Sequence, residues 1–535
     1  MKKLVIFYLI LLYYAGTVFA QNGTLGTLAY ALDENGTLTI SGTGIIPSTF
    51  MGTISSNNSA FRDMEYLVIE EGITGIGISA FINCRNLESV TFPGTLTKID
   101  GNAFDNCSKL PLLYFPASVS SITPISFQGC DALSYLSVHP DNPTYSSADG
   151  VIFNKNKTRL VLCPPGRKGT YSIPASVNII DNHAFLNCGE LSAITIPNSV
   201  SIIETFAFSG AGVTSLDIPE GVTSIGISAF NMCTKMTAVN IPASVTTIGS
   251  NAFFFCLFLH SISVHEANPV FSSIDGVLFN KNNKTLVTYP VRKQQIYTVP
   301  EGVEIIGESA FYNCRGLKSI TFPTSLTTIG KQAFFACAEL TFIDLPASIT
   351  TIGSDAFSLC LGLVEVVNHK AIPQSISSKT FDNPFFSARI LRVPSSAINL
   401  YKDATEWKEF KCIVSLDDEL SLEIGRNDIY LLTNETTVIT PTVTGGLAVD
   451  YIDGYFDNTD VATVDYTGAI SALKPGSTVI TVYFGSMKAT FTVTVFAPGN
   501  SIIKRIVNNA GTEVVRVNLY KKTTESNTKK TNAGD

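Results

Sequence analysis

Charged side chains are scarce in this 535-residue chain, at 15% of the sequence against roughly 25% in an average soluble protein. Disorder requires charge and low hydrophobicity, whereas 45% of this chain is hydrophobic, so we expect most of it to fold. Basic residues are also in the minority, with 36 Lys and Arg against 44 Asp and Glu and a net charge of -8. Since no positive excess is present to neutralise phosphates, we expect no nucleic-acid partner.

Cysteines are also scarce. Eleven cysteines in 535 residues are too few for a scaffold built on disulfides. No Cys-x-x-Cys spacing points to zinc. We also find no Ser/His/Asp set, no paired carboxylates and no glycine-rich phosphate loop that breaks the sequence pattern. The sequence therefore predicts no enzyme, no catalytic residue, no metal site and no cofactor.

Long hydrophobic runs are missing after the first residues. Lys2 and Lys3 precede an apolar run, Leu4 to Tyr14, that is shorter than the ~20 residues of a membrane-spanning helix. Small residues follow at Val18 to Ala20, so 1–20 is predicted to be a secretory signal peptide. We expect an exported protein, secreted or on the cell surface, with no membrane-spanning segment after cleavage.

What the chain does contain is a repeat of about 23 residues, marked by Ala-Phe dipeptides and a following Cys. A unit begins with an L-x-x-I-x-I-P stretch such as 340–346, continues with S-V-T-x-I-G as in 244–249, and closes with A-F-x-x-C. The first stretch alternates apolar and polar residues, which is typical of a strand, and its proline ends the strand. Because one unit cannot bury its own apolar face, the sequence predicts a mainly β, right-handed leucine-rich-repeat solenoid of stacked coils.

A longer repeat of 126 residues is superimposed on these coils. Two near-copies, VHPDNPTYSSADGVIFNKNKTRL at 138–160 and VHEANPVFSSIDGVLFNKNNKTL at 264–286, lie within islands at 131–172 and 257–298. Asp149-Gly150 and Asp275-Gly276 are hairpin-turn dipeptides, so each island is predicted to carry a hairpin that projects from the solenoid. In the recurring Gly-x-x-Ala-Phe turns, glycine is expected to supply a special backbone angle.

The domain organisation follows from where the repeat stops. We expect an N-terminal cap at 21–59, the solenoid at 60–389 and a C-terminal cap at 390–415, in which Tyr401 to Phe410 forms a short helix around the only tryptophan, Trp407. Strand-like runs between turn signals predict a β-sandwich at 416–497. The rest, 498–535, is a polar tail, of which 521–535 is expected to be disordered.

The unit IPASVTTIGSNAFFFC resembles the BspA-like leucine-rich repeat of bacterial and some protist surface proteins, over roughly residues 60–393. The segment DNTDVATVDYTGAISALKPGSTVITVYFGSMKATFTVTV resembles the bacterial Ig-like domain of adhesins of the intimin and invasin type. Together the resemblances imply a secreted or surface-exposed bacterial protein that adheres to host matrix proteins and to other bacteria.

Two sets of residues have a structural and a functional interpretation. The repeated cysteines could form disulfides between coils, but we favour buried, small apolar residues, and Ala211 replaces Cys in one coil. His139 and His265 occupy the same place in the 126-residue repeat. We attribute this match to duplication of a strand end and not to two equivalent sites.

The strongest surface candidate is the face of the repeated strand, whose outward positions are about half Ser or Thr and carry little charge. Candidate binding residues on it are Tyr114 and Tyr135, as an aromatic anchor in adjacent coils, with His260 and Phe342; the islands are a second candidate. Two functions remain open: an adhesin for host extracellular-matrix or cell-surface proteins, and a glycan-capturing surface protein. The alternative is that the Ser and Thr residues only stabilise the sheet through cross-strand ladders.

Overall fold

The computed structural model describes residues 21–497 except for 56–58, 383–388, 411, 426, 444–446, 449–452, 457–459, 466 and 485–486, together with two strands at 502–507 and 513–519. The signal peptide expected at 1–20 and the disordered segment expected at 521–535 lie outside the described residues. The chain divides into two units, which we treat separately. Unit 1 is Met1–Leu340, Pro346–Gly362 and Gln374–Asp382, and unit 2 is Thr341–Leu345, Leu363–Pro373 and Asn383–Asp535.

Each coil of unit 1 begins with a strand because alternate apolar side chains bury one side of it. In β9 (Leu112–Phe115), Leu113 and Phe115 are buried whereas Leu112 and Tyr114 face solvent. Successive strands of this kind pair in parallel, as β9 does with β11. These long strands are β5 (Tyr66–Ile69), β7 (Ser89–Thr91), β9, β11 (Tyr135–Val138), β15 (Gly169–Ser172), β17 (Leu191–Thr195), β19 (Ser215–Asp217), β21 (Ala238–Ile241), β23 (Ser261–Val264), β27 (Ile296–Thr298) and β29 (Ser319–Thr321).

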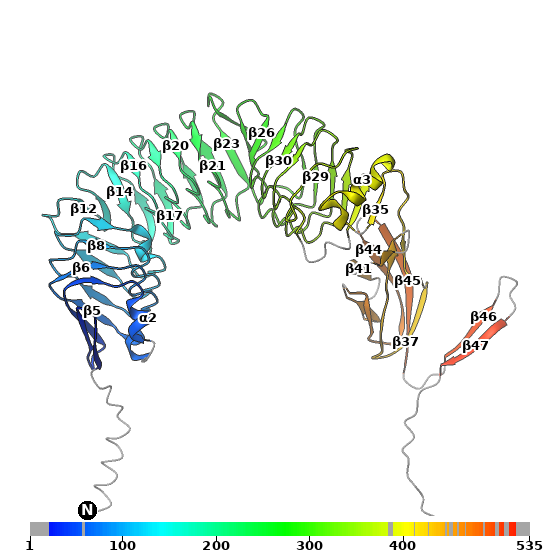
Figure 1. The fold of residues 1–535 in the computed structure, drawn as a ribbon, viewed down its shortest axis with the longest axis horizontal. Coiled ribbons are helices and arrows are strands. Elements are labelled where there is room, and N and C mark those ends of the chain that lie inside the picture. Colours follow the sequence, from blue (N-terminus) through cyan, green and yellow to red (C-terminus); the bar gives the residue numbers. More distant parts are fainter. Residues whose placement is uncertain are drawn as a thin grey trace, which may run out of the picture. The chain divides into compact units, whose positions relative to one another are not determined.

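A second, shorter strand follows in each coil and forms the other parallel ladder, in which β16 pairs with β18 and β18 with β20. Figure 1 shows these strands of unit 1 side by side in chain order. The predicted coils of about 23 residues are therefore confirmed. The short strands are β6 (Ile73–Ile76), β8 (Lys98–Ile99), β10 (Ser121–Ile122), β16 (Ile179–Ile180), β18 (Ile202–Ile203), β20 (Ser224–Ile225), β22 (Thr247–Ile248), β28 (Ile305–Ile306), β30 (Thr328–Ile329) and β32 (Thr351–Ile352).

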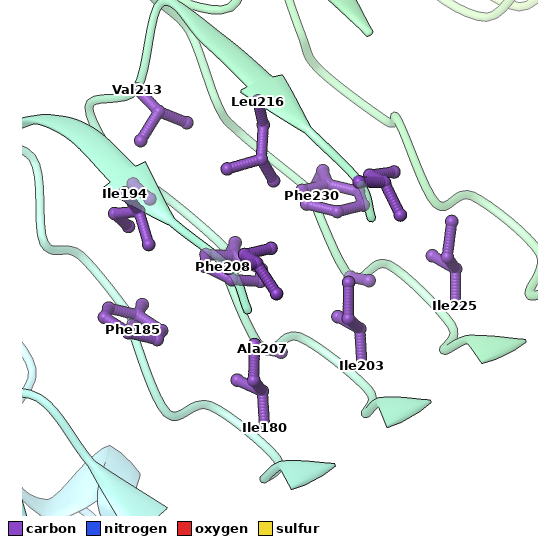
Figure 2. Packing of buried hydrophobic residues seen from close by; sticks show 14 of the residues in the cluster. Ile180, Phe185, Ile194, Ile203, Ala207, Phe208, Val213, Leu216, Ile225 and Phe230 are labelled. Atoms are coloured by element: carbon purple, nitrogen blue, oxygen red, sulfur yellow. The ribbon is translucent and has the colours of Figure 1, made fainter. Parts of the chain in front are cut away.

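Stacked rings fill the space between the ladders (Figure 2). Phe185, Phe208 and Phe230 are fully buried, with ring centroids 4.9 Å and 5.4 Å apart and nearly parallel planes. Ile203 and Ile225 repeat in the same way beside them. Each coil thus buries its apolar side chains against those of its neighbours, as the repeat length requires.

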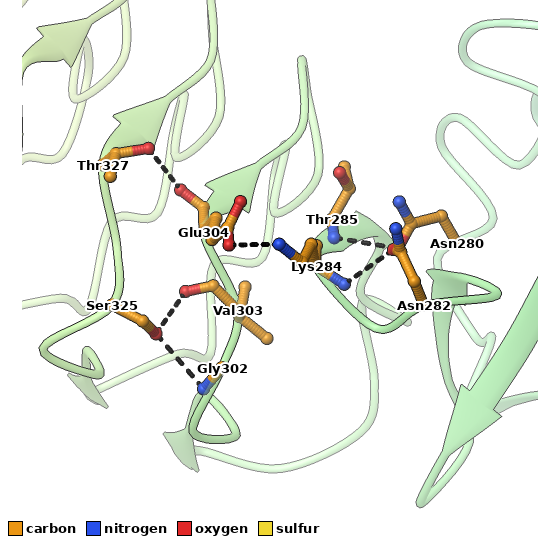
Figure 3. Close-up of polar contacts among 9 residues, drawn as sticks. All are labelled: Asn280, Asn282, Lys284, Thr285, Gly302, Val303, Glu304, Ser325 and Thr327. Atoms are coloured by element: carbon orange, nitrogen blue, oxygen red, sulfur yellow. Dashed lines mark hydrogen bonds and ion pairs between the residues drawn. The ribbon is translucent and has the colours of Figure 1, made fainter.

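All eleven cysteines are buried and none forms a disulfide, so the prediction of buried apolar residues is confirmed. The thiols donate weak hydrogen bonds to backbone carbonyls of the preceding coil, such as Cys130 Sγ to Phe104 O at 3.1 Å and Cys233 Sγ to Phe208 O at 3.0 Å. Ala211 is equally buried. Two additional columns of hydroxyl groups join neighbouring coils, and Figure 3 shows Ser325 donating to the carbonyl of Val303 and Thr327 to that of Glu304.

Our expectation for the turn glycines is wrong. Gly226, Gly249 and Gly353 do not have a positive φ; the left-handed residue is the one two positions later, for example Ser228 at φ 51°. Glycine is required there because a Cβ atom would overlap the backbone of the preceding coil. The physical reason is close approach between coils and not a special angle.

The predicted hairpins form, but they do not project. β12 (Tyr145–Ala148) pairs with β13 (Val151–Asn154), which pairs with β14 (Arg159–Leu162), and β14 then pairs in parallel with β16. The second copy repeats this with β24 (Phe271–Ile274), β25 (Val277–Asn280) and β26 (Thr285–Thr288). Each hairpin lies within the ladder because its apolar side chains, including Val151 and Phe153, are fully buried.

The first coil is covered by an antiparallel meander, β1 (Gln21–Leu25), β2 (Leu28–Leu32) and β3 (Thr37–Gly42), whose last strand pairs in parallel with β5. The strand β4 (Gly44–Ile46) pairs with β6. Among the described residues of unit 1, the helices are α2 (Phe50–Ser55) and the 3₁₀ helices η1 (Ser59–Asp63) and η2 (Pro124–Phe127).

Unit 2 contains a four-stranded parallel sheet, β31 (Phe342–Leu345), β33 (Glu365–Asn368), β34 (Ile390–Val393) and β35 (Cys412–Ser415). The helix expected at Tyr401 to Phe410 is misplaced. The chain forms the 3₁₀ helix η4 (Ser395–Ala397), then α3 (Ile398–Asp403), and only then η5 (Trp407–Glu409), because Glu406 adopts a φ of 69° that no continuous helix allows. Trp407 is fully buried, as expected for a capping residue.

Where the structure describes the chain after residue 416, it forms strands, turns and irregular segments and no helix. β37 (Asp428–Leu432), β45 (Met487–Phe496), β44 (Gly476–Phe484) and β41 (Asp453–Phe456) form one sheet. Two three-stranded sheets complete this part, and their buried residues share one apolar cluster with the first sheet. The strands of these two sheets are β36 (Leu422–Glu423), β39 (Thr442–Val443), β40 (Leu447–Ala448), β38 (Thr436–Val438), β43 (Ala469–Ala472) and β42 (Ala462–Val464).

In the predicted polar tail, 498–535, the described residues form a hairpin. β46 (Ile502–Val507) pairs in antiparallel fashion with β47 (Glu513–Leu519).

Candidate functional site

A patch of exposed apolar side chains stands out on the strand face of unit 1. Leu112, Tyr114 and Tyr135 are 56%, 47% and 52% exposed, and we call them the tyrosine patch. Leu112 and Tyr135 lie directly opposite each other on β9 and β11, whereas Tyr114 lies opposite Ser137. The two tyrosines are therefore on adjacent strands, as predicted, but diagonal to each other.

The patch rests on a rigid base. The alternating residues of the same strands, Leu113, Phe115 and Leu136, are buried with at most 1% exposed. The ring of Tyr114 lies edge-on to that of His139 at 6.3 Å between centroids, and the Tyr135 ring lies over the backbone of the hairpin turn at Gly150. Because both rings are held from one side, the other side is presented to solvent in a fixed orientation.

The remaining candidates are not part of this patch. His260 is exposed and its backbone N–H donates to Thr237 O at 2.9 Å, at the start of β23 in another sheet. Phe342, 38% exposed, is on β31 in unit 2, where it lies opposite Glu365. The sequence-based set thus separates into one pair of neighbours and two isolated residues. Leu112 was not among the predicted residues, although the apolar run LPLLYFP has an extra leucine at an outward position.

His139 and His265 have equivalent structural roles. Nδ1 of His139 accepts the backbone N–H of Asp141 at 3.1 Å, and Nδ1 of His265 accepts that of Ala267 at 3.2 Å. Each ring closes the turn that leads into a hairpin, which agrees with inheritance by duplication.

The buried thiols are unsuited to nucleophilic catalysis and to metal binding. Burial, with the neighbouring thiols of Cys130 and Cys84, raises the pKa of Cys107 well above its ordinary value, and burial does the same for Cys188 and Cys337. A thiol that stays protonated is neither a nucleophile nor a metal ligand. In the part of the chain that the structure describes, no cluster of three or more His, Cys, Asp or Glu side chains could hold a metal ion. Nor does any helix among the described residues have the length and apolarity to cross a membrane.

Comparison with known protein families identifies the repeat. A sequence profile for the BspA type leucine rich repeat region matches in six copies, over residues 53–159, 169–285 and 290–408. No curated protein matches the chain.

Three solved structures that match the chain have 18–23% sequence identity to it. One is a leucine-rich repeat protein from Eubacterium ventriosum, 23% identical, matched over 68% of this chain and 99% of that one with a TM-score of 0.40. A leucine rich cell surface protein from Faecalibacterium prausnitzii is 23% identical over 75% of this chain and 96% of that one, with a TM-score of 0.35. The pneumococcal vaccine antigen PcpA is 18% identical over 75% of this chain and 99% of that one, also with a TM-score of 0.35.

Proposed function

Because the chain belongs to the BspA-type leucine-rich repeat family, we propose that it is a noncatalytic adhesin, secreted or on the bacterial cell surface, that binds a host matrix protein or another cell. The observation that carries the proposal is the tyrosine patch. Three large apolar side chains, each about half exposed, lie together on a strand face otherwise rich in Ser and Thr. Exposed apolar patches on a rigid scaffold are typical of protein-binding surfaces.

The chemistry of the patch favours a protein ligand. Tyrosine rings offer contact area with little loss of side-chain entropy, and their hydroxyl groups bond to partner backbone. Leu112 adds an aliphatic side chain directly opposite Tyr135. Beside the patch, Arg167 forms an ion pair with Asp149, the residue before the turn glycine that lies under the Tyr135 ring. Because this neighbouring cation is neutralised, the surroundings do not select for phosphate or other highly charged ligands.

We further infer that residues 416–497 are a bacterial Ig-like domain that acts as a spacer. The antiparallel pairing of β44 with β45 and the apolar cluster shared by the sheets support this assignment. The predicted signal peptide supports export.

The test is a binding screen with the full chain against immobilised fibronectin, fibrinogen, collagen and laminin, and on a glycan array. We expect saturable binding to a matrix protein, weakened about tenfold or more in the variant Leu112→Ser, Tyr114→Ser, Tyr135→Ser. Ile227→Ser is the matched control, because this residue is 50% exposed on a coil turn of unit 1 and belongs to no patch described above.

The glycan alternative makes a different prediction. Under it, the chain binds sugars only, and replacing both tyrosines by Ala abolishes that binding because sugar rings stack on aromatic faces. Binding that is unaffected by the triple variant would exclude the tyrosine patch, and absence of binding to every protein and glycan tested would refute the adhesin proposal.

A further inference from the structure

The two copies of the 126-residue repeat differ in the residues of one turn. Comparing the copies therefore shows which side chains are particular to the second one. In the first copy this turn contains Gly129, Asp131 and Ala132, and in the second the equivalent positions are Phe255, Leu257 and Phe258. On the facing loop, Gly166 of the first copy becomes Arg292 in the second. Small or acidic residues are thus replaced by large apolar ones and a cation within the same fold.

The residues of the second copy line a groove of about 550 Å³ in unit 1. Phe255, Leu257 and Phe258 form an apolar wall, and Leu257 and Phe258 are 37% and 48% exposed. Arg292 lies across the wall with its guanidinium carbon 5.4 Å from the centre of the Phe258 ring, and its backbone N–H donates to Leu259 O at 2.9 Å. The groove therefore combines a solvent-exposed aromatic surface with a cation fixed above it.

Phe255 is held in an unfavourable backbone conformation. Its φ is 54°, at the position where the first copy has Gly129 with a φ of 70°. A bulky side chain is disfavoured in this left-handed region. The ring is fixed by contacts with Phe254 and Tyr312, at 4.6 Å and 5.7 Å between centroids. Other coils have asparagine at this left-handed position, for example Asn187 and Asn313, so the backbone conformation does not account for an aromatic residue here.

The rim of the groove is positive although the chain as a whole carries a net charge of -8. Arg292, Lys293 and Arg315 line it and no carboxylate does. Lys293 pairs with Asp275 at 2.8 Å, whereas the Arg315 Nε donates to the amide oxygen of Asn313 at 2.8 Å. Among the described residues, neither Arg292 nor Arg315 has a carboxylate partner within ion-pair distance. These two guanidinium groups are therefore positioned to receive an anion from outside the chain.

The equivalent place in the first copy has no apolar aromatic wall and no unpaired arginine, although Lys168 lines it. It is a hollow of about 440 Å³ whose lining includes the carboxylate of Asp131. Arg167 of the first copy is not available to bind an external anion, because it already forms an ion pair with Asp149. Its guanidinium carbon also lies 4.6 Å from the centre of the Tyr171 ring. An arginine at Gly166 would require the neighbouring backbone to shift, because its Cβ would overlap the carbonyl oxygen of Asp131. The groove is thus a feature of the second copy and not of the repeat.

The geometry points to a second binding site in this groove, for an acidic peptide segment of a partner protein that also carries a bulky apolar side chain. The apolar side chain packs on Phe255 and Phe258, and carboxylates bond to Arg292 and Arg315. The exposed amides of Gln294 and Gln295 on the rim bond to the peptide backbone. This site lies on other strands and turns than the tyrosine patch, so it goes beyond the function proposed above.

The test uses fluorescein-labelled octapeptides with a Gly/Ser background around Asp-Phe-Asp, Lys-Phe-Lys or Asp-Ala-Asp, and measures fluorescence anisotropy with the full chain. We expect the Asp-Phe-Asp peptide to bind with Kd below about 1 mM and the other two to bind at least about tenfold more weakly. Raising the salt concentration weakens the binding because the guanidinium–carboxylate pairs are exposed.

The decisive variant is Phe258→Ala with Arg292→Gly, which gives the second copy the residues of the first copy and therefore keeps a fold that the chain already adopts. We expect it to lose binding of the Asp-Phe-Asp peptide about tenfold or more. Arg85→Gly, which removes an exposed cation from another turn, serves as the charge-matched control and retains binding. The tyrosine-patch triple variant also retains it, which separates this site from the proposed adhesin surface.

Equal binding of all three peptides, no binding below about 1 mM, or unchanged binding by the double variant would overturn the proposal. Heparin is included as a competitor. If heparin binds to this groove and the acidic peptide does not, the ligand is a sulfated glycan and the peptide assignment is wrong.

Discussion

Asn142 and Asn268, 126 residues apart, make the same four hydrogen bonds in the two copies of the hairpin. Each side chain is fully buried. The amide nitrogen of Asn142 donates to the carbonyls of Pro116 and Val119, at 3.1 Å and 2.8 Å, and its oxygen accepts the N–H groups of Thr144 and Tyr145 at 2.8 Å. The asparagine thus joins the entrance of the hairpin to the preceding coil.

The first prediction follows from this network. Asn142→Ala leaves the carbonyl of Val119 and the N–H groups of Thr144 and Tyr145 without these partners, whereas the Pro116 carbonyl still accepts the N–H of Val119. We therefore expect the free energy of unfolding to fall by about 2–3 kcal/mol. Denaturant unfolding measures this. Asp141→Ala is the control, because its side chain is 86% exposed, and it should change stability by less than about 0.5 kcal/mol. Equal effects of the two substitutions would contradict the role of the buried amide.

The second prediction concerns the stacked rings. Phe208→Ala removes a fully buried ring from contact with Phe185 and Phe230, and we expect a loss of about 3–5 kcal/mol. Phe208→Leu fills part of the space and should cost less. Since each coil contacts mainly its neighbours, hydrogen exchange should accelerate most in the coils on either side of residue 208. Uniform acceleration along unit 1 would show that the coils are more strongly coupled than their contacts indicate.

The third prediction is a dependence of stability on pH. Burial raises the pKa of Cys107, Cys188 and Cys337 above the ordinary thiol value of 9.0. Below the thiol pKa of the unfolded chain, the thiols are protonated in both the folded and the unfolded state. In that pH range their titration therefore does not change the free energy of unfolding. Above about pH 9 the unfolded thiols lose protons and the folded ones do not, so the free energy of unfolding falls as pH rises.

Denaturant unfolding between pH 7 and pH 10.5 checks this. The variant with all three cysteines replaced by Ala should lose less stability over that interval than the unmodified chain, whatever its stability at pH 7. In the native state at pH 7, a maleimide reagent should label none of the eleven thiols, and it should label all of them after denaturation. Fast labelling of native protein would mean that the coils open readily.

The fourth prediction separates backbone strain from contact at the first hairpin turn. Gly150 has a φ of 73°, and a Cβ there would lie 2.8 Å from the Tyr135 ring, whereas Gly169 has a φ of 78° with no atom within 4 Å. Gly169→Ala should therefore cost about 1 kcal/mol from the backbone alone. Gly150→Ala should cost more and should also weaken binding at the tyrosine patch, because the Tyr135 ring must move. Equal stability losses and unchanged binding would contradict the contact.

The repeat was predictable from the sequence because the stacking of identical coils depends on spacing alone. Phe185 and Phe208 stack because they are one coil apart, and the outward direction of Tyr114 and Tyr135 follows from alternation. The sequence did not reveal that Tyr135 lies opposite Leu112 and diagonal to Tyr114, since the register between two strands depends on where each strand begins.

Other features depend on contacts between distant residues. The hairpins were expected to project because Asp149-Gly150 indicates a turn, but a turn dipeptide does not say which sheet the strands join. The role of Gly249 depends on the backbone of Ile227 in the preceding coil, which no local pattern reveals. The break at Glu406 has no glycine or proline to mark it. The groove was missed because FFFCLF reads as one more coil turn until the facing loop with Arg292 is placed beside it.

The register of the parallel ladders constrains how this chain can change in length. A single inserted residue within a strand would turn its buried side chains to solvent and its exposed ones inward. Insertion or loss of the whole 126-residue block would instead preserve every strand pairing, since Asn142 and Asn268 meet equivalent neighbours. We therefore expect recombination between the two near-identical segments to yield folded size variants of the protein, which differ in the number of grooves they carry and not in their fold.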